Sequence, residues 1–83
     1  MVHPIKRIRE KHDLSQIELS VVLNCTPGFV AQIEMGVKPS VRFVKDLCFL
    51  FNLNPDNLKK EIDEYRADLK NKILSGGKFG KAH

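Results

Sequence analysis

Signals for the start of a helix recur along this sequence at short intervals, and they constrain the fold more than any other feature. Each is a proline suited to a first helical turn, a side chain suited to cap a helix, or both. They occur at Pro4, Ser15, Thr26-Pro27, Pro39-Ser40 and Asn54-Pro55. None of the stretches between them shows the sustained alternation of a β-strand. We therefore predict an all-α protein of five helices.

The same signals predict where each helix lies. Counted from their opening residues, the predicted helices span residues 4–12, 15–23, 26–34, 39–51 and 54–74. The strongest start is a capping box, in which Ser15 caps the amide three residues on and Glu18 reaches back. Asn24 and Gly36 follow the second and third helices and suit a left-handed helix exit.

Length and composition fit one small globular domain. The chain has 83 residues, of which 42% are hydrophobic and 29% are charged, and these values are ordinary for a folded protein. No apolar run approaches the roughly 18 residues that span a bilayer, and the first residues lack the pattern of a secretory signal. Since a chain this short needs its apolar side chains for a core, we expect no large catalytic cleft.

Cysteine and histidine usage argues against a disulfide scaffold, a metal site and an enzyme. Cys25 and Cys48 lie in apolar stretches, where a thiol acts as a small hydrophobic residue. We therefore predict free core thiols in a cytoplasmic protein. The histidines and cysteines form no closely spaced ligand set, so we predict no metal and no other cofactor. Without a nucleophile–base pair or a phosphate-binding glycine loop, we predict no catalytic residues.

Residues 14–36 carry the most informative pattern. Two short helices are joined by only a few residues, and a turn that short makes helices cross at about 90–120°. The residues that would then face inward are Leu19, Ser20, Leu23, Cys25, Val30 and Ile33. Ser20 falls at the closest approach, where only a small residue fits. The second helix of the pair can project from the body and enter a DNA major groove.

The spacing of these residues resembles one known family. The residues that carry the likeness are Ile5, Lys6, Ile8, Arg9, Leu14, Ser15, Gln16, Glu18, Leu19, Ile33, Glu34, Gly36, Lys38, Pro39 and Ser40. Over about residues 4–58 they are similar to the phage-repressor and Cro-like (XRE) helix-turn-helix proteins. The resemblance implies a lambda-repressor-like fold and double-stranded DNA as the partner.

The resemblance also implies roles for particular residues. The residues that it places at the DNA are Gln16, Thr26, Pro27, Gly28, Phe29, Gln32 and Lys38. Gln16 would contact a phosphate and brace the third helix, and Lys38 would contact the DNA backbone. Arg9 and Glu34 match an ion pair between the first and third helices.

Two positions of the recognition helix depart from the family pattern. Pro27 and Gly28 stand where long polar side chains are common, which leaves Gln32 to bond adenine. Thr26 can serve as a helix cap instead, and Phe29 could contact thymine methyl groups or lie against a partner surface. Specificity would then depend on close backbone approach and DNA shape as well as on base contacts.

The fifth predicted helix carries one apolar stripe on a charged surface. The stripe consists of Leu58, Ile62, Tyr65, Leu69 and Ile73. Apolar residues also stand where the family often has polar ones, at Ile17, Val21, Val22, Phe43 and Phe49. Two outcomes stay open, and both can hold at once. The helix folds back over these residues, or its stripe pairs with that of a second subunit, as in dimers that bind two DNA half-sites.

The favoured interpretation is a homodimeric repressor that binds specific DNA sequences. It comprises a DNA-binding domain at 1–58, a helical extension at 59–74 and a flexible basic tail at 75–83. We expect no membrane contact. Two alternatives stay open: an antitoxin that also binds its own promoter, with a protein partner on the fourth and fifth helices, and an interaction module that no longer binds DNA. The net charge of +4 is weak support for DNA binding, because most of the excess lies after residue 57.

Overall fold

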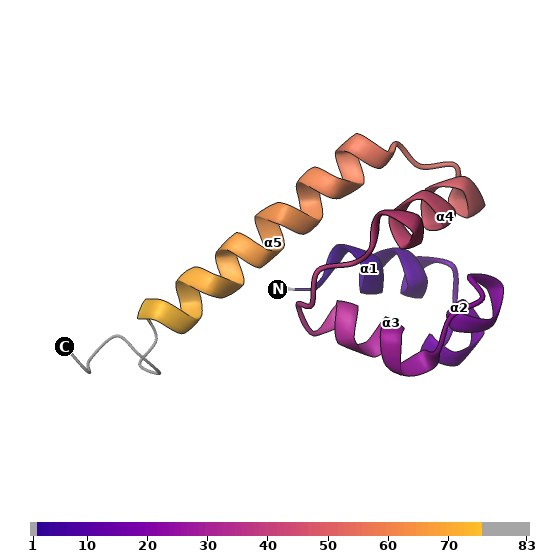
Figure 1. The fold of residues 1–83 in the computed structure, drawn as a ribbon, viewed down its shortest axis with the longest axis horizontal. Coiled ribbons are helices and arrows are strands. Elements are labelled where there is room, and N and C mark those ends of the chain that lie inside the picture. The colour runs from indigo at the N-terminus through magenta and orange to yellow at the C-terminus, as the bar shows by residue number, and fades with distance from the viewer. Residues whose placement is uncertain (1, 76–83) are drawn as a thin grey trace.

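The computed structural model describes residues 2–75. This part of the chain contains five α-helices and no β-strand. The helices are α1 (Pro4–Lys11), α2 (Gln16–Val22), α3 (Pro27–Glu34), α4 (Val41–Phe51) and α5 (Pro55–Ser75). The first four gather into one body, from which the long α5 extends (Figure 1). The predicted all-α architecture is confirmed.

Local sequence signals set where the helices begin. Ser15 Oγ accepts a hydrogen bond from Glu18 N at 3.0 Å, and Ser15 N donates to Glu18 Oε1 at 2.8 Å, which completes the capping box. Thr26 caps α3 through its hydroxyl, and Ser40 caps α4 in the same way. The side chain of Asn54 accepts from two amides at the start of α5. These caps satisfy amides that a helix start leaves without partners.

Left-handed backbone ends four of the helices, and after α1 it lies at Asp13, with a φ of 55°. Asn24 after α2 has a φ of 55°, and Gly36 after α3 has a φ of 114°. Asn24 and Gly36 are the residues predicted to end these two helices. Asn52 ends α4 with a φ of 55°. Glycine and asparagine adopt such angles more readily than other residues, so the chain can reverse at these points.

Every helix contributes to a single core. Its buried members are Ile5, Ile8, Leu19, Val30, Ile33, Phe43, Leu47, Cys48, Leu58 and Ile62. The residues predicted to face inward are buried, except that Leu23 and Cys25 are half-buried. Cys25 and Cys48 are free thiols, as predicted, and burial raises the pKa of each.

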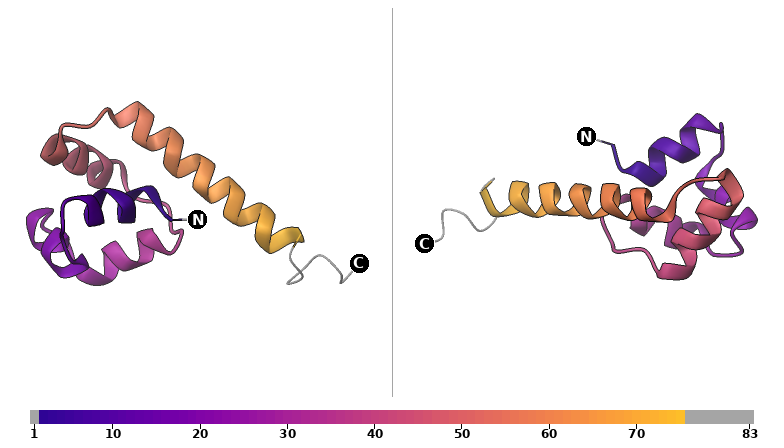
Figure 2. Two further views of the ribbon diagram at one scale, coloured as in Figure 1. Left: turned by 180° about the vertical axis from the view of Figure 1, so that it is seen from behind. Right: turned by 90° about the horizontal axis from the view of Figure 1, so that it is seen from above.

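The helix α5 lies partly on the body and partly beyond it. Leu58 and Ile62 are only 3% and 2% exposed, because α1 and α4 pack against this part of the helix. The expectation that these two residues contact a second subunit is therefore not met. The ring of Tyr65 lies edge-on to that of His3, with centroids 4.7 Å apart. Further along, α5 leaves the body and Ile73 is exposed (Figure 1, Figure 2).

Of the apolar residues expected to lie beneath α5, only Phe43 is buried, in the core to which α5 contributes Leu58 and Ile62. Five exposed apolar residues remain on α2 and α4, namely Ile17, Val21, Val22, Phe49 and Leu50. Val22, Phe49 and Leu50 line one shallow depression, which we call the apolar patch. Their exposure runs from 41% at Leu50 to 90% at Phe49. Phe49 follows buried Leu47 by two residues, which turns it about 200° around α4 and away from the core. The helix α5 does not cover this patch.

Two further expectations concern the membrane and the tail. Within residues 2–75, no helix has both the length and the apolar character needed to cross a membrane. Of the predicted flexible tail at 75–83, only Ser75 is described, and it is the last residue of α5. The rest of that prediction lies outside the described residues.

Candidate nucleic-acid interface

A short turn fixes α3 against α2. Cys25 N donates to Ser20 O at 2.9 Å, and Asn24 N donates to Val21 O at 3.2 Å, so the turn follows directly from α2. Ser20 is buried, and its hydroxyl donates to Ile17 O at 2.6 Å. A larger side chain at Ser20 would have to displace the neighbouring core residues. The turn and the small residue together produce the predicted helix-turn-helix.

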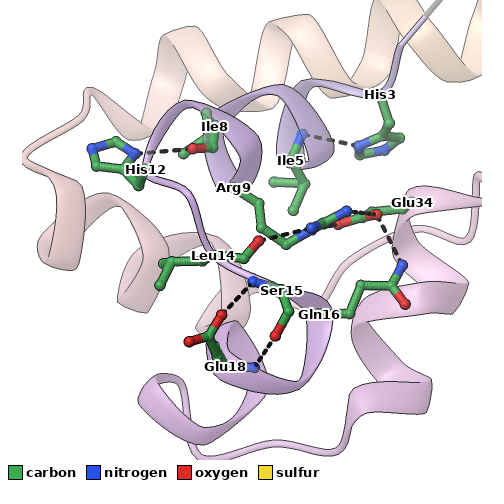
Figure 3. A network of polar contacts seen from close by, with 10 residues as sticks. All are labelled: His3, Ile5, Ile8, Arg9, His12, Leu14, Ser15, Gln16, Glu18 and Glu34. Carbon is green, nitrogen blue, oxygen red and sulfur yellow. Dashed lines mark hydrogen bonds and ion pairs between the residues drawn. The ribbon is translucent and has the colours of Figure 1, made fainter.

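An ion pair joins α1 to the end of α3 (Figure 3). Arg9 Nε donates to Glu34 Oε2 at 2.7 Å, and Arg9 Nη2 donates to Glu34 Oε1 at 3.1 Å. Gln16 Nε2 donates to the same Oε1 at 3.0 Å. Arg9 Nη1 also donates to Leu14 O at 2.8 Å. This network ties α1, the loop after it and the start of α2 to the recognition helix.

The network keeps Glu34 ionised. Burial by itself would raise the pKa of Glu34, but the hydrogen bonds from Arg9 and Gln16 act against it. The positive charges of Arg9 and Lys6 act in the same direction, and the pKa of Glu34 lies below its ordinary value. The hydrogen bond to Glu34 raises the pKa of Arg9. The predicted ion pair with Arg9 and the predicted contact from Gln16 are thus both present, and the carboxylate of Glu34 has a structural role.

The outward side of α3 carries most of the residues predicted to face DNA. Pro27, Gly28 and Gln32 are exposed. A side chain added at Gly28 would meet no atom within 4 Å, so packing does not require glycine there. Thr26 is exposed too, but its hydroxyl already accepts from Phe29 N at 3.1 Å. Gln32 is therefore the long polar side chain that this surface offers to a base.

Phe29 is placed differently from the other predicted DNA contacts. It is half-buried, and its ring lies edge-on to that of Phe43 with centroids 5.5 Å apart. It packs against the core of its own chain. This placement differs from both roles considered for it, a thymine contact and a partner surface. We assign Phe29 to the packing of α3 on α4.

Lys38 lies exposed in the loop between α3 and α4. The backbone of this loop is bonded to the end of α3, since Val37 N donates to Gln32 O at 3.0 Å. From the other side, Arg66 Nε of α5 donates to Gly36 O at 2.9 Å. No sequence pattern indicates this second contact, because Arg66 is one of many charged residues on α5.

Sequence reasoning also missed the role of His3. Its Nδ1 accepts a hydrogen bond from Ile5 N at 3.1 Å, which caps α1, and the side chain is buried. The position directly before Pro4 is the signal that could have indicated this cap. Burial lowers the pKa of His3, although the charge of Glu34 acts in the opposite direction.

The fold and this interface define a helix-turn-helix DNA-binding protein. The chain belongs to the helix-turn-helix family of the XRE, Cro and C1 type, whose family model, described as helix-turn-helix, matches residues 5–58. Membership implies DNA binding in a transcriptional regulator, and the family is typically not enzymatic. No curated protein and no solved structure matches the chain. The part of α5 beyond Leu58 lies outside the matched residues.

Proposed function

We propose that this protein is a cytoplasmic transcriptional repressor that binds specific DNA sequences as a dimer. The observation that carries this proposal is the division of α3 into two sides. Gln32 is exposed on the outward side, whereas Val30 and Ile33 on the inward side are fully buried. A helix held in this way can lie in the major groove, which is about 12 Å wide. A protein bound at a promoter would then exclude RNA polymerase.

Base recognition would combine one side chain with the shape of the DNA. The amide of Gln32 can bond N6 and N7 of adenine. Gly28 and Pro27 bring no polar side chain, and the open space around Gly28 lets the start of α3 approach the bases closely. Close approach of backbone makes binding sensitive to groove width and to the ease of bending the DNA.

Phosphate contacts would flank the recognition helix. Gln16 uses one amide hydrogen on Glu34, and its second amide hydrogen is available to a phosphate oxygen. Lys38 is exposed in the loop at the other end of α3. Such contacts fix the orientation of a protein on the duplex without carrying sequence information themselves.

The second subunit would contact the far part of α5. The core covers Leu58 and Ile62, but the apolar stripe continues beyond them. Ile73 and Leu74 are 38% and 46% exposed, and half-buried Leu69 lines the same shallow pocket. Two copies joined here by two-fold symmetry would present two recognition helices to half-sites about 34 Å apart.

Selection of binding sites from random duplex DNA at physiological salt tests this function. A dimeric reader should enrich an inverted repeat with half-sites one helical turn apart. An enriched single half-site would overturn the dimer, and the absence of enrichment would overturn sequence-specific binding. The selected sequence placed over a reporter promoter should lower transcription when the protein is expressed.

The apolar patch on α2 and α4 favours a second candidate function, the binding of a protein partner. An exposed cluster of this kind marks interaction sites more often than ordinary surface. Phe49, Leu50 and Val22 line one shallow depression between the two helices. A toxin gene next to this one would favour an antitoxin that also binds its promoter. A folded protein that selects no DNA would favour an interaction module.

A further inference from the structure

The helix α5 holds the loop that follows the recognition helix. Arg66 is half-buried, and its Nε donates to Gly36 O at 2.9 Å. A Cβ atom at Gly36 would lie only 2.6 Å from Leu69 Cδ2, so the backbone of the loop is in direct contact with α5. Both contacts come from a part of the helix outside residues 5–58, which the family model matches.

The loop that α5 holds is continuous with the proposed DNA contacts. Gly36 N donates to Ile33 O at 3.0 Å, and Val37 N donates to Gln32 O at 3.0 Å. Lys38 follows at the next position. The φ of 114° at Gly36 suits glycine and strains other residues, and because glycine is conformationally free, the path of the loop from α3 to Lys38 depends on the contacts that hold it. A loop that moves at Gly36 therefore moves Lys38 with it.

We propose that Arg66 is a positioning residue for DNA binding, which through Gly36 O fixes the loop that carries Lys38 against the DNA backbone. This role rests on the proposed function and extends it, because it makes the helix outside the helix-turn-helix a determinant of DNA affinity. The guanidinium suits the task, since its planar Nε–H holds a fixed direction toward a carbonyl. A lysine ammonium at the same place keeps the charge but lacks that geometry.

Amide hydrogen exchange tests the contact in the free protein. Arg66→Ala should speed exchange of the Gly36 and Val37 amides by about two- to tenfold, the range expected when one hydrogen bond is lost. The amide of Leu19 in the core should be unaffected. Lys60→Ala is the matched control, because it removes an exposed cation from the same helix. Unchanged exchange at Gly36 and Val37 in Arg66→Ala would overturn the proposal.

A double-mutant cycle on the selected DNA site tests the effect on binding. Arg66→Ala should raise Kd about two- to tenfold in the wild-type background. In the Lys38→Ala background it should have no further effect, because the residue that it positions is already gone. If the increases in Kd of the two single variants multiply in the double variant, Arg66 acts independently of Lys38, and this result would overturn the proposal.

Arg66→Lys separates positioning from a direct phosphate contact. A positioning role predicts that this variant binds as weakly as Arg66→Ala, whereas a phosphate contact would be restored by the retained charge. Restored binding would overturn the proposal. A wild-type protein that binds no DNA would overturn the proposed function and the role of Arg66 together. A wild-type protein that binds DNA, with losses that multiply in the cycle, would overturn the role of Arg66 alone.

Discussion

Glu34 at the end of α3 and Arg9 in α1 meet through two hydrogen bonds, of 2.7 Å and 3.1 Å. The two residues are 25 positions apart in the chain. Their side chains are 5% and 11% exposed, so water screens the pair very little. Removal of one partner from such a pair leaves a buried charge without compensation. The orientation of the recognition helix thus depends on a contact far from its outward side.

Glu34→Ala should lower the free energy of unfolding by about 3 kcal/mol. The substitution leaves the Arg9 guanidinium buried without its carboxylate and removes the acceptor of Gln16. Urea denaturation at neutral pH measures the loss. Arg42→Ala is the control, because the Arg42–Asp46 pair is exposed and 3.5 Å apart. It should cost less than about 1 kcal/mol, and equal costs for the two variants would contradict the importance of burial.

Stability should fall on mild acidification because of His3. Burial lowers the pKa of His3, so the unfolded chain takes up a proton at higher pH than the folded one. The stabilisation is fully present above the ordinary value of 6.5 and is lost as the pH falls below it. The slope of the free energy of unfolding against pH should reach at most about 1.4 kcal/mol per pH unit from this one group. Urea denaturation between about pH 7 and pH 5 covers this window.

His3→Asn separates this effect from other titrations. Asparagine keeps an oxygen that can cap α1 and does not titrate. The variant should therefore lose stability less steeply than the wild type across this window. Glu34, whose pKa is lowered, contributes stability that is lost only as the pH falls below its ordinary value of 4.5. If the stability of the variant falls with pH as steeply as that of the wild type, His3 is not the group responsible.

Gln32→Ala should weaken binding to the selected site by about 1–3 kcal/mol and relax the preference at one base pair. The side chain is exposed, so the free energy of unfolding should stay within about 0.5 kcal/mol of the wild type. Competition binding on the selected site and on its single-base variants measures both quantities. Equal losses on every sequence would exclude Gln32 from base recognition.

Lys38→Ala should weaken binding to all sequences and lower the slope of log Kd against log salt by about one. The reason is that one phosphate contact releases about one condensed counterion. Titrations at several salt concentrations measure the slope. Lys60→Ala, which removes an exposed cation from α5, should leave the slope unchanged. The same slope for Lys38→Ala and the wild type would remove Lys38 from the phosphate contacts.

The helix bounds could be predicted from the sequence because helix caps act locally. Ser15 and Glu18 bond within one turn, and Thr26 caps an amide three residues away. The pair of Arg9 and Glu34 spans 25 positions, and its prediction needed the family resemblance. A likeness between sequences supplies distant contacts that local patterns do not.

The course of α5 could not be predicted from its periodicity. Leu58 and Ile73 belong to one apolar stripe, yet only Leu58 reaches the core. Periodicity shows which side of a helix is apolar, but the length of the body decides where that helix loses contact with it. The contact of Arg66 with the loop after α3 could not be predicted either, since its acceptor is a backbone carbonyl, which every residue carries.

Ile73→Glu should convert the proposed dimer to a monomer without unfolding it. Ile73 is exposed and lies where α5 has left the body, so a charge there costs the folded monomer little. In an apolar contact between two copies, the same charges would be buried without partners. Sedimentation equilibrium over a range of concentrations measures the mass. Phe49→Glu, in the apolar patch, should leave the mass of the dimer unchanged. A monomeric Phe49→Glu beside a dimeric Ile73→Glu would instead place the contact between subunits on α2 and α4.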